Sequence, residues 1–376
     1  MYFDRSDLSD TQLKSFYKAL LYPRLIEEKM LLLLRQGRIS KWFSGIGQEA
    51  IAVGATLALD ADEWIMPLHR NLGVFTTREM PLDKLLLQWQ GSEHGYSKGR
   101  ERSFHFGSSP HHICGMISHL GPQLSIADGI ALAHQLKKEK KVALAFTGEG
   151  GSSEGEFHEA LNVAAVWGLP VIFLIENNGY GLSTPVNEQY HCAGLVDKAI
   201  GYGMEGVQID GNNLLEVYQT VRTARAYAIQ EQKPVLIEAM TFRMRGHEEA
   251  SGVKYVPPAL FEEWGKKDPI LQYEAWLQEK HILTTADIAA IRDELKHQIE
   301  ADVARGLVDT PIVADTQVEV NDLYAPAPAV VATAGPSSEK RFINALSDGL
   351  KQAMEKHPEL ILMGQDIAEY GGAFKI

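Results

Sequence analysis

Two short turns hold the residues of this chain that are best suited to chemistry. The first is GEGG at 148–151, after the apolar run KVALAF, and the second is NNGY at 177–180, after the apolar run LPVIFLI. If the two runs are neighbouring parallel strands, both turns lie where open α/β sheets bind ligands. Glycine N–H groups and a following helix N-terminus could hold a diphosphate there. Glu149, the side-chain oxygen of Asn178 and a backbone carbonyl are hard oxygen ligands that suit Mg²⁺.

Two plainer interpretations of the same turns remain open from spacing alone. One is a nucleotide-binding turn, although a dinucleotide fingerprint would need Gly or Ala where Ser153 stands. A Walker-type loop would need Gly-Lys-Ser/Thr, which is absent here. The other is a strand-to-helix turn without a ligand. The residues favour a site for Mg²⁺ and a diphosphate.

The segments around the turns alternate between short apolar runs and amphipathic stretches. This alternation is typical of βαβ units, so we predict the α/β class, with a parallel sheet covered by helices on both faces. The predicted strands are 141–146, 169–175, 206–209 and 234–240. The predicted helices are 10–36, 48–59, 81–89, 123–138, 154–167, 193–200, 213–231, 269–280 and 284–305. In the first helix we expect Asp10 as N-cap and a kink or a break at Pro23.

The sequence pattern changes beyond Met240. A polar stretch at 243–268 is predicted to be a working loop without secondary structure. The Ala- and Pro-rich residues 309–338 read as a semi-extended linker between a domain over 1–308 and a second segment over 339–376. That segment should begin with a helix and continue into a strand, ELILMG, at 359–364.

Charge and cysteine content narrow the class of protein. The formal net charge of −13 argues against binding to nucleic acid or to an anionic membrane surface. No apolar run is long enough to cross a bilayer. Two cysteines without C-x-x-C spacing suit a reducing compartment, so we expect a cytoplasmic protein with no membrane and no nucleic-acid partner.

The GEG and NN turns resemble the two ends of the thiamine diphosphate motif. The resemblance extends through GRISKWFSGIGQEAIAVGA, HRNLG, SKGRERSFHFG, GLSTPVNEQY, IDGNN and PVLIEAMTFRMRGH. Together these segments resemble the α-type subunit of the decarboxylating component of 2-oxo acid dehydrogenases, over about residues 10–305. Within this family the chain is most similar to the branched-chain (2-oxoisovalerate) members, on the basis of GEG, the RIS segment at 38–40 and STP-x-x-EQY. Pyruvate and acetoin dehydrogenases are the alternative assignments.

This resemblance implies thiamine diphosphate and Mg²⁺ as cofactors and assigns residues to them. Arg70 would hold the diphosphate, for which a guanidinium is well suited. Ser118, Leu120 and Gly121 would supply contacts to the aminopyrimidine and the apolar wedge that bends the cofactor. The residues that would hold Mg²⁺ and diphosphate are Gly148, Glu149, Gly150, Gly151, Asn178 and Tyr180, with Glu149, Asn178 and the Tyr180 carbonyl as the metal ligands.

Histidines carry the catalytic assignments that the resemblance implies. His247, in RMRGH, matches the active-site histidine beside the cofactor's reactive carbon, where it would orient or protonate the intermediate. His69 stands where the family usually has Tyr and would line the cofactor as a second catalytic candidate. His105 matches a histidine that could line the site. The dense group formed with His111, His112 and Cys114 lacks the paired spacing of a zinc site.

The implied function is oxidative decarboxylation of a branched 2-oxo acid in branched-chain amino acid catabolism, followed by transfer of the acyl group to a lipoyl group. The implied partners are a β-type half that supplies the activating Glu, the lipoyl domain of a dihydrolipoyl acyltransferase, and a second copy in a homodimer or α2β2-like assembly. Residues 339–376 resemble the opening of a β-type subunit, with GQDI at 364–367 and GG at 371–372.

Three further expectations follow from these assignments. The chain would be a fused fragment that is inactive alone. A non-catalytic cofactor-binding or assembly module remains the alternative from another class. Glu248 and Glu249 occupy the place where animal members carry a phosphorylated Ser, so control by phosphorylation at that position is not expected.

Overall fold

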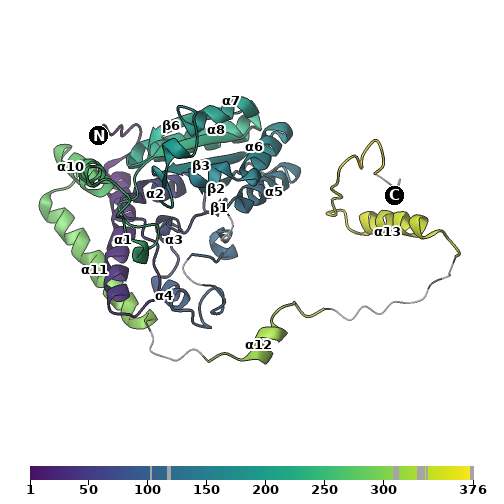
Figure 1. Cartoon of the computed structure of the whole chain (residues 1–376), viewed down its shortest axis with the longest axis horizontal. Coiled ribbons are helices and arrows are strands. Elements are labelled where there is room, and N and C mark those ends of the chain that lie inside the picture. The colour runs from purple at the N-terminus through teal and green to yellow at the C-terminus, as the bar shows by residue number, and fades with distance from the viewer. Residues whose placement is uncertain (102–103, 117–119, 308–312, 328–334, 336–337, 373–376) are drawn as a thin grey trace. The chain divides into compact units, whose positions relative to one another are not determined.

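The computed structural model describes residues 1–101, 104–116, 120–307, 313–327, 335 and 338–372. It divides into two units, Met1–Ile312 and Val313–Ile376 (Figure 1). This division falls inside the segment 309–338 that the sequence marks as a linker.

A parallel sheet forms the centre of the first unit. Its five strands run in the order β1-β2-β3-β7-β6, and every neighbouring pair is parallel. Their bounds are β1 Trp64–Met66, β2 Ala143–Gly148, β3 Val171–Asn177, β6 Glu205–Asp210 and β7 Val235–Met240. Gly148 pairs with Glu176, so β2 and β3 end at nearly the same level. A small antiparallel ribbon, β4 Tyr180–Gly181 and β5 Thr184–Pro185, follows β3.

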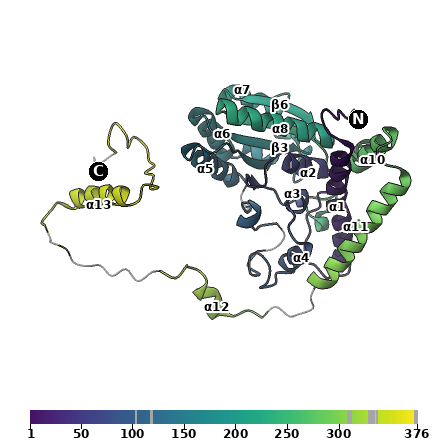
Figure 2. The ribbon, with the colours of Figure 1, turned by 180° about the vertical axis from the view of Figure 1, so that it is seen from behind.

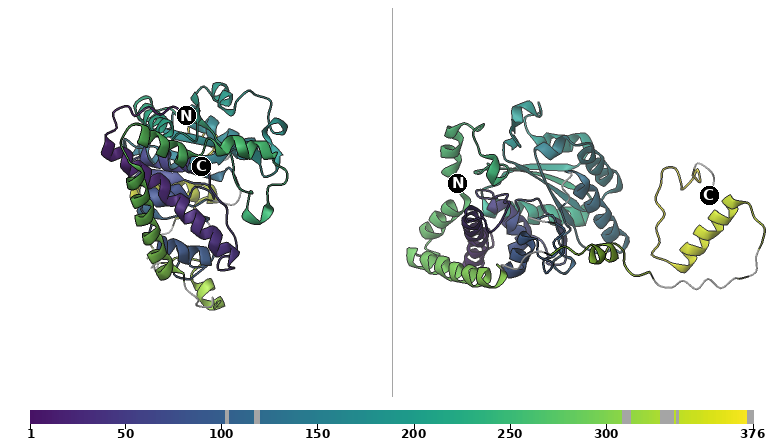
Figure 3. Two further views of the ribbon diagram at one scale, coloured as in Figure 1. Left: turned by 90° about the vertical axis from the view of Figure 1, so that its left-hand side faces the viewer. Right: turned by 60° about the horizontal axis from the view of Figure 1, so that its bottom comes forward.

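Helices cover both faces of this sheet (Figures 2 and 3). Alternate strand residues point to opposite faces, so Leu144 and Phe146 join one apolar cluster while Ala143 and Ala145 join another. The first cluster includes α2 (Glu49–Leu57) and α8 (Leu214–Glu231), and the second includes α5 (Pro122–Leu136) and α6 (Gly155–Trp167). The predicted α/β class is confirmed, because continuous apolar strands require cover on both sides.

The first helix, α1 (Asp10–Arg35), continues through Pro23. The predicted break is therefore wrong, and the N-cap is Ser9, which forms a capping box with Gln12, rather than Asp10. Pro23 is itself buried, and α1 contributes about half of its residues to the core. We attribute the continuity to this packing, because it opposes the roughly 3 kcal/mol that proline costs inside a helix.

The remaining helices of the first unit include two elements that the sequence did not predict. These are α3 (Leu72–Thr77) and α9 (Pro258–Gly265). The stretch 243–268 is thus not free of secondary structure, because Pro258 starts a helix at a position where a missing N–H costs nothing. The others are α4 Leu82–Gln90, α7 Lys198–Tyr202, α10 Pro269–Glu279 and α11 Thr285–Gly306. Figure 3 shows α11 beside α1, and the two helices are in contact.

The second unit holds two helices, α12 (Thr316–Asn321) and α13 (Phe342–Lys356). The linker is therefore not wholly extended, and the strand predicted at 359–364 does not form. Leu360, Ile361, Leu362 and Met363 are exposed there, and a strand needs a hydrogen-bonded neighbour to be stable. Among the described residues, no helix combines the length and the apolar character needed to cross a membrane.

Candidate active site

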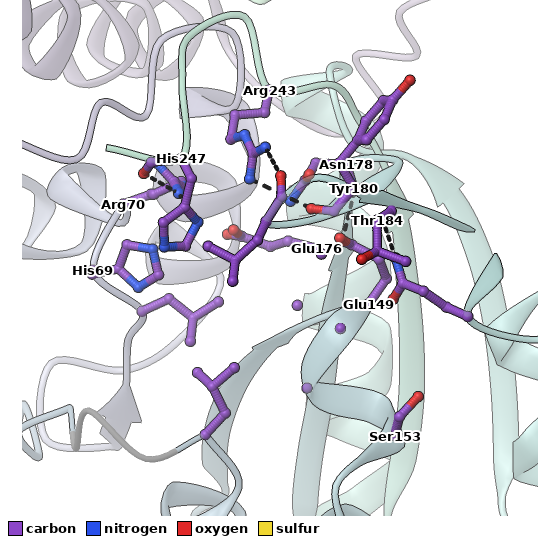
Figure 4. A pocket seen from close by; sticks show the side chains of 18 residues that line it. His69, Arg70, Glu149, Ser153, Glu176, Asn178, Tyr180, Thr184, Arg243 and His247 are labelled. Atoms are coloured by element: carbon purple, nitrogen blue, oxygen red, sulfur yellow. Dashed lines mark hydrogen bonds between the residues drawn. The ribbon is translucent and has the colours of Figure 1, made fainter. Parts of the chain in front are cut away.

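A cavity of about 370 Å³ lies at the carboxyl ends of β2 and β3 (Figure 4). It brings together residues from five separate parts of the chain. The wall includes Leu68, His69, Arg70, Leu120, Gly148, Glu149, Gly150, Gly151, Glu176, Asn178, Tyr180, Leu182, Arg243 and His247. Ten of the twelve residues assigned from the sequence therefore line one cavity.

The two turns meet because the strands that precede them are adjacent. The backbone N–H of Asn178 donates to Glu149 Oε2 at 3.1 Å, which joins the turn after β3 to the turn after β2. Gly151 lies in a tight 3-10 turn, Gly150–Ser153, and a Cβ atom on it would lie 2.5 Å from Thr147 Oγ1. The chain thus passes close to the strand end at this point, which only glycine allows.

The metal-ligand candidates present oxygen atoms that suit Mg²⁺. Asn178 Oδ1 is buried and accepts no hydrogen bond from the described residues. Glu149 is 1% exposed, and burial raises the pKa of its carboxyl group. A divalent cation would satisfy both groups at once. The Tyr180 carbonyl already accepts a hydrogen bond from Arg243 Nη1 at 3.4 Å, so this third ligand has a competing partner.

Arg70 lines the cavity and contacts His247. Its Nη2 donates to the His247 carbonyl at 2.5 Å and lies 3.1 Å from His247 Nδ1. Its Nη1 donates to the Ser44 carbonyl at 3.3 Å. Burial and the nearby Arg243 lower the pKa of Arg70 to about 9, so the side chain is still charged at neutral pH. Two guanidinium groups at one cavity favour an anionic ligand.

The contact with Arg70 sets the tautomer of His247. A guanidinium can only donate, so Nδ1 accepts and Nε2 carries the hydrogen. Burial, then Arg70 and Arg243, lower the pKa of His247 to about 4. His247 is therefore a neutral imidazole with one N–H to donate at physiological pH.

His69 lies beside His247, with ring centroids 5.5 Å apart. Its Nε2 is buried and has no hydrogen-bond partner among the described residues, and burial holds the pKa of its ring well below the usual value. The phenol that the family usually has at this position would be larger and uncharged. His69 is also uncharged here, so the exchange preserves a neutral ring.

The three residues expected to contact the aminopyrimidine differ in their position relative to the cavity. Leu120 lines the cavity, as expected of an apolar wedge. Gly121 does not line it; with φ at 114° it forms the N-cap of α5, and a Cβ atom there would lie 2.7 Å from Glu156 Oε2. Ser118 lies outside the described residues.

Arg243 is a cavity residue that the sequence reading missed. It is 5% exposed, and its Nη2 donates to the Leu182 carbonyl at 2.5 Å and to the Tyr255 hydroxyl at 2.8 Å. It therefore ties the ribbon after β3 to the loop that carries His247. The only available signal was its place four residues before His247 in FRMRGH.

Glu176, also missed, lies at the end of β3 and lines the cavity. It accepts a hydrogen bond from Asn71 Nδ2 at 2.5 Å, and burial raises the pKa of its carboxyl group to about 7. Below pH 4.5 the group is protonated in both the folded and the unfolded chain. Between pH 4.5 and 7 only the folded chain keeps the proton, so its contribution to stability is lost as pH rises.

Glu176→Gln is therefore expected to make the free energy of unfolding less dependent on pH. Relative to the parent, the variant should gain on the order of 2–3 kcal/mol between pH 5 and pH 7.5, because Gln keeps the acceptor for Asn71 without a charge. Urea unfolding at both pH values measures this. Glu231→Gln, at an exposed helix end, is the control. Parallel pH curves for parent and Glu176→Gln would contradict the assignment.

The histidine-rich loop shows no metal cluster. His111 Nδ1 lies 2.7 Å from Ser108 Oγ, and the ring of His112 packs against Trp64. Within the part of the chain that the structure describes, no three His, Cys, Asp or Glu side chains are placed to hold a metal ion. The Mg²⁺ candidates form a different kind of set, because only Glu149 among them is a carboxylate and the other two offer an amide oxygen and a backbone carbonyl.

Comparisons with known proteins show a family match over the part of the chain that holds the cavity. The family described as "Dehydrogenase E1 component" matches residues 17–309. The chain is 38% identical over 291 residues to 2-oxoisovalerate dehydrogenase subunit alpha of Bacillus subtilis (strain 168), covering 77% of this chain and 88% of that one. It is 32% identical over 303 residues to pyruvate dehydrogenase E1 component subunit alpha of Bacillus cereus, covering 80% and 79%.

A plant relative is similar over a smaller share of its length. The chain is 35% identical over 268 residues to 2-oxoisovalerate dehydrogenase subunit alpha 1, mitochondrial, of Arabidopsis thaliana. The match covers 70% of this chain but 57% of the relative, so it spans little more than half of that protein. The family match covers most of the chain and includes every residue of the cavity, and the chain belongs to the dehydrogenase E1 component family.

Proposed function

We propose that this chain is the α-type half of a thiamine diphosphate-dependent 2-oxo acid dehydrogenase that acts on 2-oxoisovalerate and passes the acyl group to a lipoyl group. The observation that carries the proposal is one cavity holding Glu149, the unpartnered Asn178 oxygen, Arg70 and the neutral His247. The chain is an oxidoreductase of the 2-oxo acid dehydrogenase type. The relatives named 2-oxoisovalerate dehydrogenase support the branched substrate.

One group of cavity residues would bind Mg²⁺, and another group would bind the diphosphate. Glu149 and Asn178 would hold Mg²⁺, with the Tyr180 carbonyl as a third ligand once Arg243 turns from it. Arg70 and the N–H groups of the glycine turn would hold the diphosphate. Thiamine diphosphate, when bound, supplies an electron sink for the pair left by departing carbon dioxide.

His247 and His69 provide neutral groups on the side of the cavity opposite the metal turn (Figure 4). The Nε2–H of His247 can donate a hydrogen bond or a proton to a substrate oxygen, and Arg70 fixes the ring while it does so. The apolar neighbours Leu68, Leu120 and Leu182 line the same space and limit access of water.

The partners are part of the proposal. We propose that the site is completed by a β-type half, which supplies the activating carboxylate, and that the acyl group leaves to the lipoyl domain of an acyltransferase. The helix α13 and the GQDI segment after it resemble the start of such a half. Both cysteines are unpaired in the structure, which supports the proposal of a reducing, cytoplasmic environment.

A substrate panel tests the proposed reaction. The chain is combined with a purified β-type subunit, thiamine diphosphate and Mg²⁺, and decarboxylation is followed with a dye as electron acceptor. We expect 2-oxoisovalerate to exceed pyruvate in kcat/KM by roughly 10-fold or more, the scale of discrimination by apolar pocket contacts. A preference for pyruvate would assign the chain to the pyruvate branch. Cofactor binding without turnover of any 2-oxo acid would favour a non-catalytic module.

A further inference from the structure

The segment Trp42–Gly45, between α1 and α2, packs against the cationic side of the cavity; we call it the 42–45 segment. The ring of Phe43 lies 4.8 Å from the ring of His69 and 5.7 Å from the ring of His247, measured between centroids. The guanidinium carbon of Arg70 lies 5.9 Å from the same ring. One side chain of the segment thus contacts all three residues.

The backbone of the 42–45 segment is tied to the same residues. The Ser44 carbonyl accepts from Arg70 Nη1 at 3.3 Å, and the Trp42 carbonyl accepts from the N–H of Glu249, two residues beyond His247, at 3.0 Å. Gly45 has no room for a side chain, because a Cβ atom would overlap the Arg70 carbonyl oxygen. A displacement of the segment would therefore displace Arg70 and the His247 loop.

Glu27, from α1, holds the segment at both ends. Its Oε2 accepts from Trp42 Nε1 at 2.6 Å, and its Oε1 accepts from the Gly45 N–H at 2.8 Å. The side chain is 1% exposed and is not part of the cavity wall. Two N–H groups converge on one carboxyl group, and a carboxylate is the side chain that offers an acceptor oxygen to each.

The buried surroundings of Glu27 disfavour the charged form of its carboxyl group. Burial raises the pKa of Glu27 to about 7, the hydrogen bonds from Trp42 and Gly45 oppose this, and the nearby Glu49 adds to it. A buried acid that is fully used as a double acceptor, yet touches no ligand space, indicates a role in holding other residues.

We infer that Glu27 is a positioning residue, which sets Arg70 and His247 in their working places through the 42–45 segment. Neither the sequence motifs nor the cavity wall includes it. Only one part of this inference, the effect of Glu27 on cofactor binding, rests on the proposed function. Its effect on His247 can be measured without any cofactor.

Glu27→Gln tests the first effect, because its NH₂ group would face one of the two N–H donors. Calorimetry with thiamine diphosphate and Mg²⁺, in the presence of a purified β-type subunit, should show affinity weakened by roughly 10-fold or more, the scale seen when a supporting hydrogen bond behind a ligand is lost. Tyr17→Phe is the matched control: it removes a buried hydrogen bond of the same helix, to Glu274, that does not involve the segment. The control should bind within about 2-fold of the parent.

The titration of His247, followed by nitrogen NMR in the cofactor-free chain, tests the second effect. In the parent the pKa of His247 is about 4, held there by burial and by Arg70, Arg243 and Lys41. Near pH 4 the carboxyl group of Glu27 is protonated in the parent but still presents an oxygen atom to each donor, whereas Glu27→Gln presents an NH₂ group to one of them. In the variant the His247 midpoint should therefore rise by at least about 1 pH unit toward the ordinary value, because Arg70 is displaced from the ring. Trp42→Phe removes one of the two donors and should move the midpoint less, in the same direction.

The outcomes separate the two claims. If Glu27→Gln leaves both the affinity and the His247 midpoint as in the parent, the positioning role is wrong. If the parent combined with a β-type subunit binds no thiamine diphosphate, the proposed function fails, and the His247 titration still decides the role of Glu27. If Glu27→Gln does not fold, Trp42→Phe carries the test, and an unchanged midpoint in that variant overturns the inference.

Discussion

Replacing Glu149 with alanine is expected to weaken the joint binding of Mg²⁺ and thiamine diphosphate by at least about 100-fold. Glu149 is the only charged group among the three metal-ligand candidates, and it lies buried in the cavity wall. Without it the cation would be held by an amide oxygen and a carbonyl alone. Calorimetry of thiamine diphosphate at fixed Mg²⁺ and in the presence of a β-type subunit, with parent and variant side by side, measures the loss.

A neighbouring carboxylate provides the control for this experiment. Glu154 lies in the same turn, is exposed, and is not part of the cavity wall. Glu154→Ala should bind as the parent does, which would separate loss of a ligand from a general loss of negative charge near the site. Equal affinities for Glu149→Ala and the parent would show that the metal is held elsewhere.

His247→Gln should reduce turnover of the completed enzyme by roughly 10²- to 10⁴-fold while leaving cofactor affinity within about 3-fold. The amide oxygen of Gln can replace Nδ1 as the acceptor from Arg70, and its NH₂ group can still donate. It cannot transfer a proton as imidazole does. Dye-linked decarboxylation with a β-type subunit gives kcat, and calorimetry gives the dissociation constant.

The pH profile of the parent's turnover gives a second test of the role of His247. Since the pKa of His247 is about 4 in the absence of substrate, its ring stays neutral from pH 6 to pH 8 and should cause no inflection in kcat/KM over that range. His94→Gln, on an exposed side chain remote from the cavity wall, is the control. Full turnover by His247→Gln would remove His247 from the catalytic residues.

The part of the fold that the sequence predicted best is the centre of the sheet. Val171 to Ile175 are apolar without alternation because both faces are covered, and such runs can be recognised locally. The turns after β2 and β3 were predicted to meet because parallel neighbours end on the same edge. By contrast, β1 has three residues and pairs with a segment about 80 positions away, so no local pattern marks it.

The missed residues of the site depend on tertiary contacts. Glu176 is followed by two polar residues and looks like the polar end of a strand, yet it is buried by Asn71, which is 105 positions away. Glu27 precedes another Glu and reads as the solvent side of a helix, until the 42–45 segment covers it. Arg243 gains its partners from a ribbon and a loop that the sequence does not place together.

Arg70 has a consequence for how variants of this protein are to be interpreted. The same guanidinium that is proposed to hold the diphosphate also fixes the imidazole of His247 in one tautomer. A substitution at Arg70 would therefore lower both the fraction of loaded protein and the rate of each loaded molecule. Steady-state kinetics alone would merge these two defects into one number, so Arg70 variants require saturation with cofactor before their turnover is compared with that of His247 variants.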